Sequence, residues 1–494
     1  MKLFTKAFFT LTISSLLVTG AMAQDLEWDK CFGGYSEDVG RAVQQTSDEG
    51  YIVAGYTFST GAGAADVWLI KTDAGGNKQW DKTFGGVESD WATSVQQTLD
   101  GGYIISGVTY SFGAGEHDAW LIKTDALGNK QWDKTFGGSL SDFGHSVQQT
   151  LDGGYIMAGM LDHDFWYGIG GDFWLIKTDA SGNKVWDKMF GGYNWDEAFS
   201  VQQTVEGGYV IAGTTGSFGA GSYDAWLIKT DANGNEIWNR TFGGSGWDDA
   251  YCVRQTADGG FIIAGNMWPV GMSVDFWLIK TDADGHEQWQ RTFGGTEFDK
   301  AYSLELAADG GYIMGGFTWS YGAGTIDLWL VKTDASGLKE WDQTFGAAAF
   351  DYGYDVGTTS DGGYIVTGFT ESYGAGLADV WLLKVSSDLT RISLISPDNL
   401  AVLTAPPNFE WAAYGGISNA FAVDLSFLSD FTSFYSTYEH LHQIIYGDTW
   451  TMPPGIWNRI PTGTPIYWRV RGVDLDHDPL TVITSDEVWS FNKE

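Results

Sequence analysis

Two loops of this sequence gather side chains that could bind a sugar or hydrolyse one. Residues 160–171 bring together two carboxylates, an imidazole and two aromatic rings, on Asp162, His163, Asp164, Trp166 and Tyr167. Residues 266–273 present Trp268 beside a proline. Aromatic faces suit the apolar C–H faces of sugar rings, and a pair of carboxyl groups is the usual machinery of glycoside hydrolysis. These loops are therefore our first candidates for chemistry.

Both loops interrupt a repeat that runs through most of the chain. The segment 172–192, Asp-Phe-Trp-Leu-Ile-Lys-Thr-Asp-Ala-Ser-Gly-Asn-Lys-Val-Trp-Asp-Lys-Met-Phe-Gly-Gly, returns in close copies every 51 to 54 residues. Its closing tryptophan stands at Trp28, Trp80, Trp132, Trp186, Trp238, Trp289 and Trp341. Such regular spacing indicates a repeat architecture.

Each repeat contains four short runs rich in Val, Ile, Trp, Tyr and Phe, separated by Gly, Asp and Asn, which predicts four strands. In the second repeat these strands, called a to d, are expected at residues 93–98, 102–109, 118–124 and 130–136. Their connections are short enough only for antiparallel neighbours, so each repeat should be a four-stranded meander. A repeated meander of this length predicts a blade of a β-propeller.

Seven copies of strand a and one displaced strand d predict seven blades. The last repeat ends at Val385 without a strand d, whereas residues 26–34 form a strand d that precedes any strand a. The N-terminal strand should therefore complete the last blade and close the ring, which also covers an exposed sheet edge. The expected fold class is all-β, with a seven-bladed β-propeller closed by the N-terminal strand and a C-terminal β-sandwich.

Three segments are expected along the chain. Residues 1–23 combine two lysines, an apolar run and Ala-Met-Ala, the pattern of a secretory signal peptide. Residues 24–390 should form the propeller. In residues 391–494 the period stops and short alternating strands follow, which predicts the sandwich, with Trp411 and Trp468 as core anchors.

The charge of the chain excludes several classes of partner. The formal net charge is -36, and removing the signal peptide with its two lysines makes it -38. Such a surface repels nucleic acid and anionic lipid, and no later stretch approaches the roughly 18 apolar residues of a membrane span. We expect a secreted monomer outside the cell, at its surface or in the periplasm, with no nucleic-acid partner and no membrane insertion.

The motifs WDKTFGG, DGGYI and WLIKTDA resemble the repeats of secreted bacterial proteins whose functions are mostly unassigned, some of them labelled endoglucanase-like. The turn at residues 179–186 resembles the tryptophan-docking turn of quinoprotein-type propellers and, more loosely, the Asp-box turn of sialidase-type propellers, although its Asp-to-Trp spacing fits neither consensus. The tail resembles fibronectin type III modules, where Tyr-Trp-Arg-Val is typical of a late strand. These resemblances imply a propeller fold and an extracellular role.

Aspartates recur at two fixed positions on the rim that carries the d-to-a and b-to-c loops. One set follows each Phe-Gly-Gly, or Phe-Gly-Ala in the last repeat, from Asp38 to Asp351, and the other opens each strand c, from Asp66 to Asp379. Because they occur in every blade, we interpret them as caps of loop amides rather than as a cation site. No cofactor is expected with certainty; a Ca²⁺ ion is the one candidate, at the run Asp474, Asp476 and Asp478 in the tail.

A ligand site should lie where the sevenfold likeness breaks. The two irregular loops belong to blades three and five, and Trp195 lies in a rim loop of the blade between them, so these residues are expected to form one site. The expected function is non-enzymatic: a binding or scaffold protein that recognises extracellular glycan or protein partners through the propeller rim. The alternative is a polysaccharide-acting glycoside hydrolase. The catalytic residues of such an enzyme are not identifiable.

Overall fold

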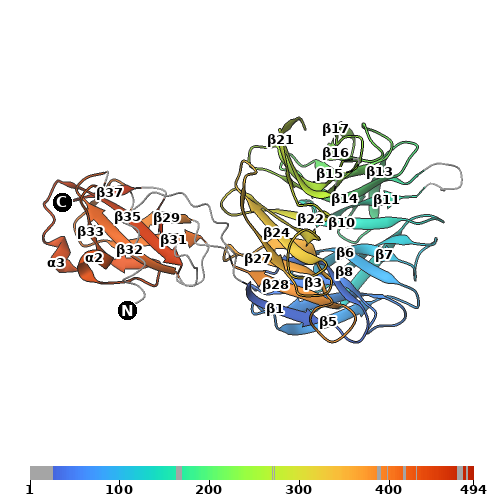
Figure 1. The fold of residues 1–494 in the computed structure, drawn as a ribbon, viewed down its shortest axis with the longest axis horizontal. Coiled ribbons are helices and arrows are strands. Elements are labelled where there is room, and N and C mark those ends of the chain that lie inside the picture. Colours follow the sequence, from blue (N-terminus) through green and yellow to red (C-terminus); the bar gives the residue numbers. More distant parts are fainter. Residues whose placement is uncertain are drawn as a thin grey trace. The chain divides into compact units, whose positions relative to one another are not determined.

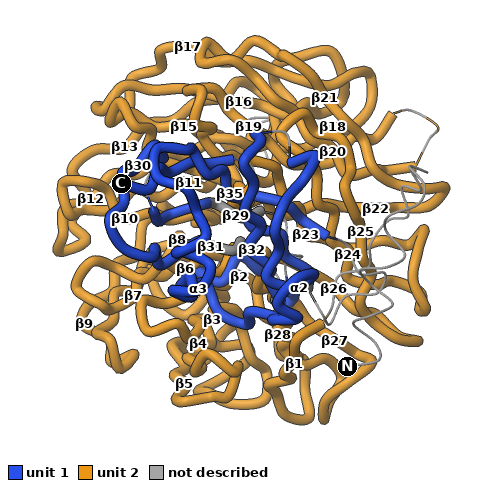
Figure 2. Tube along the Cα trace, turned by 90° about the vertical axis from the view of Figure 1, so that its left-hand side faces the viewer, with its two compact units in different colours: residues 1–25, 360–363, 385–494 blue, residues 26–359, 364–384 orange. Residues whose placement is uncertain are grey.

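The computed structural model describes residues 26–162, 170–269, 271, 273–386, 391–397, 399–414, 419–429, 431–474, 482–485 and 488–494. It is almost entirely β, as the strand-rich repeats predict (Figure 1). The described chain forms two compact units (Figure 2). The larger contains residues 26–359 and 364–384, and the smaller contains residues 385–494 with the short segment 360–363.

The larger unit consists of seven four-stranded sheets, which are the blades of a β-propeller. Six of them use strands that follow one another in sequence: β2 (Asp38–Gln45), β3 (Tyr51–Thr57), β4 (Asp66–Thr72), β5 (Lys78–Phe84); β6 (Asp90–Gln97), β7 (Tyr103–Thr109), β8 (Asp118–Thr124), β9 (Lys130–Phe136); β10 (Phe143–Gln149), β11 (Tyr155–Leu161), β12 (Asp172–Thr178), β13 (Lys184–Phe190); β14 (Asp196–Gln203), β15 (Tyr209–Thr215), β16 (Asp224–Thr230), β17 (Glu236–Phe242); β18 (Trp247–Gln255), β19 (Phe261–Trp268), β20 (Asp275–Thr281), β21 (Glu287–Phe293); β22 (Asp299–Leu306), β23 (Tyr312–Thr318), β24 (Asp327–Thr333), β25 (Lys339–Phe345). The predicted antiparallel meander is confirmed in each.

The remaining blade joins the two ends of the repeat region. Its strands are β26 (Asp351–Thr358), β27 (Tyr364–Thr370), β28 (Asp379–Val385) and, as the outer strand beside β28, β1 (Leu26–Phe32). Trp381 Nε1 donates to Asp29 Oδ2 at 3.0 Å, and Lys384 Nζ lies 2.9 Å from Glu27 Oε1. The predicted closure by the N-terminal strand is confirmed.

Strand a begins earlier than predicted. In the second blade, β6 starts at Asp90 rather than at Thr93, because its pairing with β7 continues through a β-bulge between Ala92 and Ser94. The bulge leaves Thr93 without a Cα pairing partner on β7, and the other six blades have the same bulge at the equivalent position. A bulge re-aims one side chain out of the regular alternation of a strand. The side chain of the bulge residue in each blade can therefore point in a direction that a regular strand would not allow.

Tryptophans hold each blade together and join it to the next. The tryptophan of strand c is buried, and its Nε1–H donates to a residue of strand d: Trp120 Nε1 lies 3.1 Å from Asp133 Oδ2. The tryptophan of strand d docks on the following blade, where a Cβ added to Gly128 would lie 2.5 Å from the ring of Trp80. Gly128 also has a φ of +75°, which glycine adopts without strain. These two contacts explain why Trp-Asp and Gly-Asn recur in the repeat.

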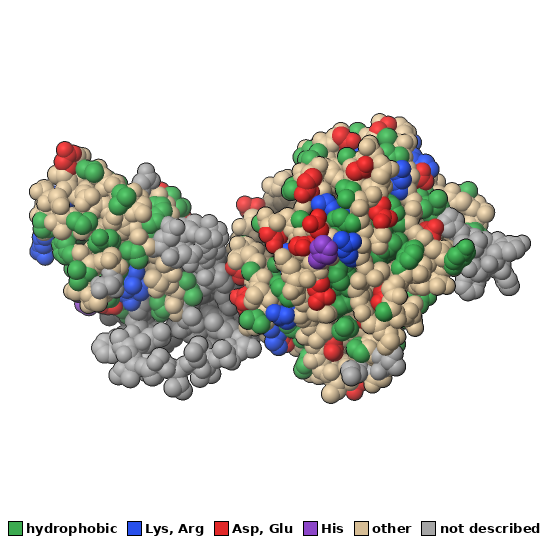
Figure 3. Space-filling view, turned by 90° about the horizontal axis from the view of Figure 1, so that it is seen from above, with side chains coloured by type: hydrophobic (Ala, Val, Ile, Leu, Met, Phe, Trp, Pro, Cys, Tyr) green, Lys and Arg blue, Asp and Glu red, His purple; other side chains and the backbone are tan. Residues whose placement is uncertain are grey.

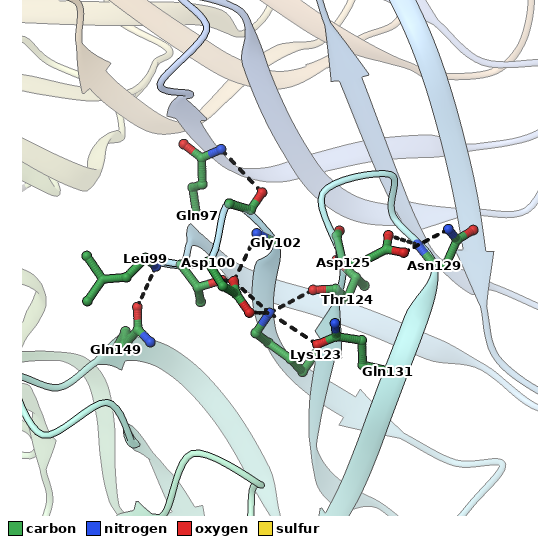
Figure 4. A network of polar contacts seen from close by, with 12 residues as sticks. Gln97, Leu99, Asp100, Gly102, Lys123, Thr124, Asp125, Asn129, Gln131 and Gln149 are labelled. Carbon is green, nitrogen blue, oxygen red and sulfur yellow. Dashed lines mark hydrogen bonds and ion pairs between the residues drawn. The ribbon is translucent and has the colours of Figure 1, made fainter.

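The a-to-b turns are held by a buried lysine of strand c, shown for the second blade in Figure 4. Lys123 Nζ lies 2.9 Å from Asp100 Oδ2 and donates to the carbonyl of Thr124 at 2.7 Å. Burial would raise the pKa of Asp100, but hydrogen bonds from Thr98, Lys123 and Gly102 outweigh it and lower this pKa to about 2. The repeated lysine and aspartate of these turns are thus structural.

The smaller unit contains two sheets around a shared core. One sheet has the order β29-β31-β34 and the other β30-β37-β35-β32-β33, with β36 beside β35. Its elements are β29 (Arg391–Ser396), β30 (Ala401–Leu403), β31 (Asn408–Tyr414), β32 (Asn419–Ser426), β33 (Tyr435–Ser436), α2 (Thr437–Leu441), β34 (Thr449–Thr451), α3 (Pro454–Trp457), β35 (Pro465–Asp474), β36 (Ile483–Thr484) and β37 (Trp489–Lys493). Trp411 and Trp468 are 1% and 0% exposed in the core between the sheets, which confirms their predicted role.

Candidate ligand-binding face

The aspartates repeated on the rim stabilise its loops. In the second blade, Asp90 Oδ2 accepts hydrogen bonds from the Gly86 amide at 2.9 Å and from Ser111 Oγ at 2.7 Å, and Oδ1 accepts one from Thr109. Asp118 Oδ2 accepts the amide of Ala114 at 2.9 Å. The interpretation of both sets as loop caps is confirmed.

The structure describes three of the predicted site residues, Asp162, Trp195 and Trp268. The amide of Asp162 donates to Asp142 at 3.0 Å, whereas His163, Asp164, Trp166 and Tyr167 lie outside the described residues. In the blade between the two irregular loops, Trp195 Nε1 donates to Glu197 Oε2 at 3.0 Å. Trp268 is 38% exposed and stacks on Trp247, with ring centroids 6.4 Å apart.

The calcium candidate falls mostly outside the structural description. Asp474 ends β35, and Asp476 and Asp478 belong to a segment that is not described. Within the described ranges, no three His, Cys, Asp or Glu side chains converge as metal ligands would. No described helix is long and apolar enough to cross a bilayer.

The seven bulge residues line the central channel of the propeller and form a site that the sequence did not predict. A cavity of about 340 Å³ lies at one mouth of the channel, and a second of about 440 Å³ continues between the inner strands. We call the first cavity the basin. Both cavities are lined by all seven bulge residues, one from each blade: Arg41, Thr93, His145, Phe199, Tyr251, Tyr302 and Tyr354. Six of the seven blades thus supply an aromatic ring or a cation.

Neighbouring blades bring these rings into contact around the basin. Phe199 lies 5.3 Å from His145 and 4.7 Å from Tyr251 between ring centroids, and Tyr302 lies 5.2 Å from Tyr251 and 5.4 Å from Tyr354. Aromatic pairs at such separations attract one another and form a rigid apolar wall. The basin therefore has a preformed aromatic lining with few polar groups, as small-ligand sites commonly do.

A half-buried carboxylate orients the one histidine of the basin. His145 Nε2 lies 2.7 Å from Glu197 Oε1, and the other oxygen of Glu197 accepts the Trp195 indole. Burial would raise the pKa of Glu197, but these two hydrogen bonds and the charge of His145 outweigh it and lower it. An ionised Glu197 favours the tautomer of His145 with a proton on Nε2, which leaves Nδ1 for other partners.

A second carboxyl group, that of Asp249, contacts the basin residue Tyr251. Asp249 is 8% exposed, and its Oδ1 accepts hydrogen bonds from Thr214 Oγ1 at 2.7 Å and from Trp247 Nε1 at 2.8 Å. The hydroxyl of Tyr251 lies 3.4 Å from Oδ2. Burial raises the pKa of Asp249, and these hydrogen bonds oppose the rise without cancelling it. Glu197 and Asp249 thus hold the lining side chains in place from outside the cavity.

Further down the channel, the repeated polar residues of strand a bind the neighbouring blade. Gln44 Oε1 accepts the amide of Gln97 at 2.6 Å, and Ser94 Oγ accepts the amide of Val147 at 3.4 Å. Later blades depart from this pattern. Arg254 and Glu305 replace glutamines and form an ion pair with a 2.6 Å contact, and Asp355 replaces a serine.

The carboxyl group of Asp355 should make the stability of the protein depend on pH. Its carboxylate accepts hydrogen bonds from Ser303 Oγ at 2.6 Å and from the Val43 amide at 2.8 Å, yet burial raises its pKa from 3.8 to about 6. Because the folded state favours the protonated form, the free energy of unfolding is highest below about pH 4. It falls by about 3 kcal/mol as the pH rises from 4 through 6. Asp355→Ser should therefore raise the melting temperature at pH 8 and leave it nearly unchanged at pH 4.

Thermal unfolding of the wild type and the Asp355→Ser variant at both pH values measures this difference. The exposed Asp284→Ser variant is the control, since Asp284 lies on a surface turn. An equal shift of the Asp355 variant at pH 4 and pH 8 would show that the carboxylate carries no such cost.

A line of aromatic rings continues from the basin along the rim. Trp247 stacks on Tyr223 at 4.4 Å and on Trp268 at 6.4 Å, and Phe298 lies 5.8 Å from Trp268 and 5.5 Å from Trp319. Trp247, Trp268 and Trp319 are 44%, 38% and 44% exposed. Trp247 opens β18, four residues before Tyr251 of the basin, so the line and the basin share one face of blade five. We call these five residues the rim aromatics.

The sequence did contain a signal for the basin. In every blade a variable residue follows the repeated Asp-x-Gly or Asp-x-Ala at the start of strand a, as in Asp38-Val-Gly-Arg41 and Asp142-Phe-Gly-His145. The surrounding residues repeat while this position changes type. It was missed because alternation in a regular strand does not reveal which side chain a bulge turns toward the channel.

Comparisons with known proteins do not assign the chain to a family. No family model matches it. The regulatory protein FlaEY of Caulobacter vibrioides is 24% identical over 201 residues, which are 35% of this chain and 21% of FlaEY. The match thus spans about a fifth of the length of that relative.

Several solved structures are similar at low identity. YCF48 bound to a D1 peptide has a TM-score of 0.39 and 14% identity, and covers 75% of this chain and 99% of its own. Sqt1 from Chaetomium thermophilum has a TM-score of 0.40 and 12% identity, with 71% and 82% covered. A fungal alcohol oxidase in complex with copper has a TM-score of 0.46 and 12% identity, with 94% and 99% covered.

Proposed function

We propose that this protein is a secreted, non-enzymatic binding protein that recognises extracellular glycan chains through the basin and the rim aromatics. The observation that carries the proposal is the line of contacting aromatic rings with three tryptophans, each more than a third exposed, beside an aromatic cavity. Exposed tryptophans in a connected row are unusual on a soluble protein and indicate a binding surface. Sugar rings place their apolar C–H faces on such rings.

The charges support a sugar over other ligands. With 63 acidic and 27 basic residues, the chain repels nucleic acid and anionic membranes. Acidic side chains are spread over the visible face of the larger unit rather than gathered in one patch (Figure 3). A neutral or sparsely charged polymer of hydroxyl-bearing rings meets no such repulsion.

Hydrolysis has less support than binding. A glycosidase places two carboxyl groups about 5–10 Å apart on either side of the scissile bond. The carboxyl groups next to the basin, Glu197 and Asp249, each accept hydrogen bonds from protein donors on both oxygens. If the protein is a glycoside hydrolase, the candidate catalytic carboxylates are Asp162 and Asp164 in the b-to-c loop of blade three. Asp164 lies outside the described residues.

The test is a glycan array followed by calorimetry, with Trp247→Ala/Trp268→Ala as the key variant. We expect the double variant to weaken the best glycan at least about 30-fold, since each stacking platform contributes on the order of 1 kcal/mol or more. Both side chains are more than a third exposed, so folding should persist. Tyr446→Ala, an exposed aromatic residue of the smaller unit, is the control.

A reducing-sugar assay on the same glycans separates binding from hydrolysis. Turnover that is lost on substituting Asp162 or Asp164 by Asn would favour the hydrolase. Unchanged affinity in the double tryptophan variant would move the site away from this rim. A protein partner captured without any glycan signal would replace the glycan as ligand. The fibronectin type III-like identity of the smaller unit, a monomeric state and export by residues 1–23 belong to the same proposal.

A further inference from the structure

The basin contains a cation, Arg41, that has no anionic partner among the described residues. Arg41 is half-buried, and its guanidinium carbon lies 4.0 Å from the ring centroid of Tyr354 and 5.8 Å from that of Tyr56. Within the described part of the chain, no carboxylate lies within ion-pair distance of this guanidinium. The two acids that precede it in sequence are engaged elsewhere: Asp38 accepts the Gly34 amide at 2.8 Å, and Glu37 accepts the hydroxyl of Tyr56 at 2.8 Å.

The other arginines of the propeller are all bound. Arg254 pairs with Glu305, with an Nη2–Oε1 distance of 2.6 Å. Arg240 and Arg291 lie on outer strands over Trp238 and Trp289 and donate to backbone carbonyls, Arg240 Nη1 to Asn239 at 2.7 Å and Arg291 Nη1 to Gln290 at 2.8 Å. Among the described residues, Arg41 therefore differs from them in having ring contacts but no hydrogen-bonded oxygen.

This arrangement is informative because acids are abundant in the chain. A guanidinium has five N–H donors in a planar fork, and a half-buried one normally finds an oxygen partner. Stacking on Tyr354 fixes the plane of the guanidinium while leaving its edge for hydrogen bonds. That edge belongs to a side chain that lines the cavity of about 340 Å³.

We infer that Arg41 is the anchor of an anionic subsite, which binds a carboxylate or sulfate group carried by a sugar ring that stacks in the basin. The inference rests on the proposed function and specifies its ligand class: a glycan with acidic sugars. Carboxylates and sulfate esters match the fork of arginine with two parallel hydrogen bonds. His145, on the same ring of bulge residues, supplies a further donor when protonated.

The charge of the whole protein limits this ligand class further. At a net charge of -36, a densely sulfated or fully uronic chain would be repelled before it reached the basin. A neutral chain with isolated acidic residues is attracted at Arg41 alone. The site therefore selects sparsely charged glycans, with a uronic acid as the expected anchor residue.

Matched monosaccharides test the subsite directly. Methyl glucuronoside and methyl glucoside share one ring and differ in the carboxylate, and methyl glucoside 6-sulfate tests the sulfate. The readout is the Nε–H cross-peak of Arg41 in an ¹⁵N-resolved NMR titration of the full mature chain, assigned by its loss in Arg41→Gln. We expect the glucuronoside to shift this peak with an affinity at least about tenfold above that of the glucoside.

Three variants give the controls. Arg41→Gln should abolish the preference for the acidic sugar, and Arg41→Lys should retain part of it, because a lysine keeps the charge without the fork. Arg240→Gln, which removes a comparable arginine–tryptophan stack outside the basin, should leave the preference unchanged. Rising salt should weaken glucuronoside binding and leave glucoside binding unaffected.

The outcomes separate this inference from the proposed function. Equal affinity for glucuronoside and glucoside, or an unshifted Arg41 peak with both acidic sugars, would overturn the anionic subsite even if the glycan array is positive. A shift at Arg41 without any binding on the glycan array would keep the anionic subsite and contradict glycan-chain recognition. A larger shift of the Arg41 peak with methyl glucoside 6-sulfate than with the glucuronoside would support the anionic subsite. The expected anchor would then be a sulfated sugar instead of a uronic acid.

Discussion

Deletion of residues 25–34 should lower the melting temperature of the mature protein by about 5 °C or more. The deletion removes β1 and with it the fourth strand of the last blade, so β28 is left as an open edge. It also removes the acceptor of the Trp381 indole and the ion-pair partner of the buried Lys384. The ring of Trp28, which docks on the turn at Gly76 of the next blade, is lost as well.

Differential scanning calorimetry of the truncated and full mature forms measures this effect. Asp29→Ala removes only the hydrogen bond from Trp381 and should have a smaller effect than the deletion. Asp133→Ala, which removes the equivalent bond inside a covalently continuous blade, is the matched control and should have a smaller effect than Asp29→Ala. An identical melting temperature for the truncated form would show that β1 does not close the ring.

Asp90→Ala should be the most damaging single substitution on the rim, at roughly 3 kcal/mol or more. Asp90 is fully buried and accepts hydrogen bonds from an amide and two hydroxyl groups, those of Gly86, Thr109 and Ser111. Without the carboxylate, the Thr109 hydroxyl remains buried with no acceptor and the part-buried donors of Gly86 and Ser111 lose theirs, which costs more than the hydrogen bonds themselves contribute. The d-to-a loop before blade two and the b-to-c loop of blade two would lose their shared anchor.

Urea unfolding of the variant against the wild type measures the change in free energy. Glu88→Ala, two residues away and exposed, should stay within about 0.5 kcal/mol of the wild type. Similar losses for both variants would mean that the repeated aspartates are not loop anchors, and a cation-binding role for them would have to be reconsidered.

Much of the fold follows from local patterns that repeat. The tryptophan spacing, the four apolar runs and the glycine turns predict antiparallel blades, because hairpins with short loops depend on residues close in sequence. The unpaired strand d at residues 26–34 predicts ring closure by counting alone. The caps formed by Asp38, Asp90 and their equivalents were also predictable, because a residue that occurs in every blade is expected to stabilise the fold.

The candidate site was predicted only in part. Trp268 was identified from its irregular loop and does lie among the rim aromatics, but Trp247, its stacking partner, was not singled out. The other loop residues expected to bind, from His163 to Tyr167, lie outside the described chain. The basin itself was missed, because its members are single residues spread over seven repeats.

The sequence by itself determined the repeat, the blades, the closing strand and the structural role of most tryptophans, since each of these rests on hydrogen bonds and packing between near neighbours. Only the tertiary structure decided which side chains meet at the channel. Arg41 and Tyr354 belong to the first and last blades, yet the closed ring places the guanidinium 4.0 Å from the tyrosine ring centroid. The bulge in each inner strand turns that residue toward the channel, and neither ring closure nor a bulge leaves a trace in the local alternation of polar and apolar residues.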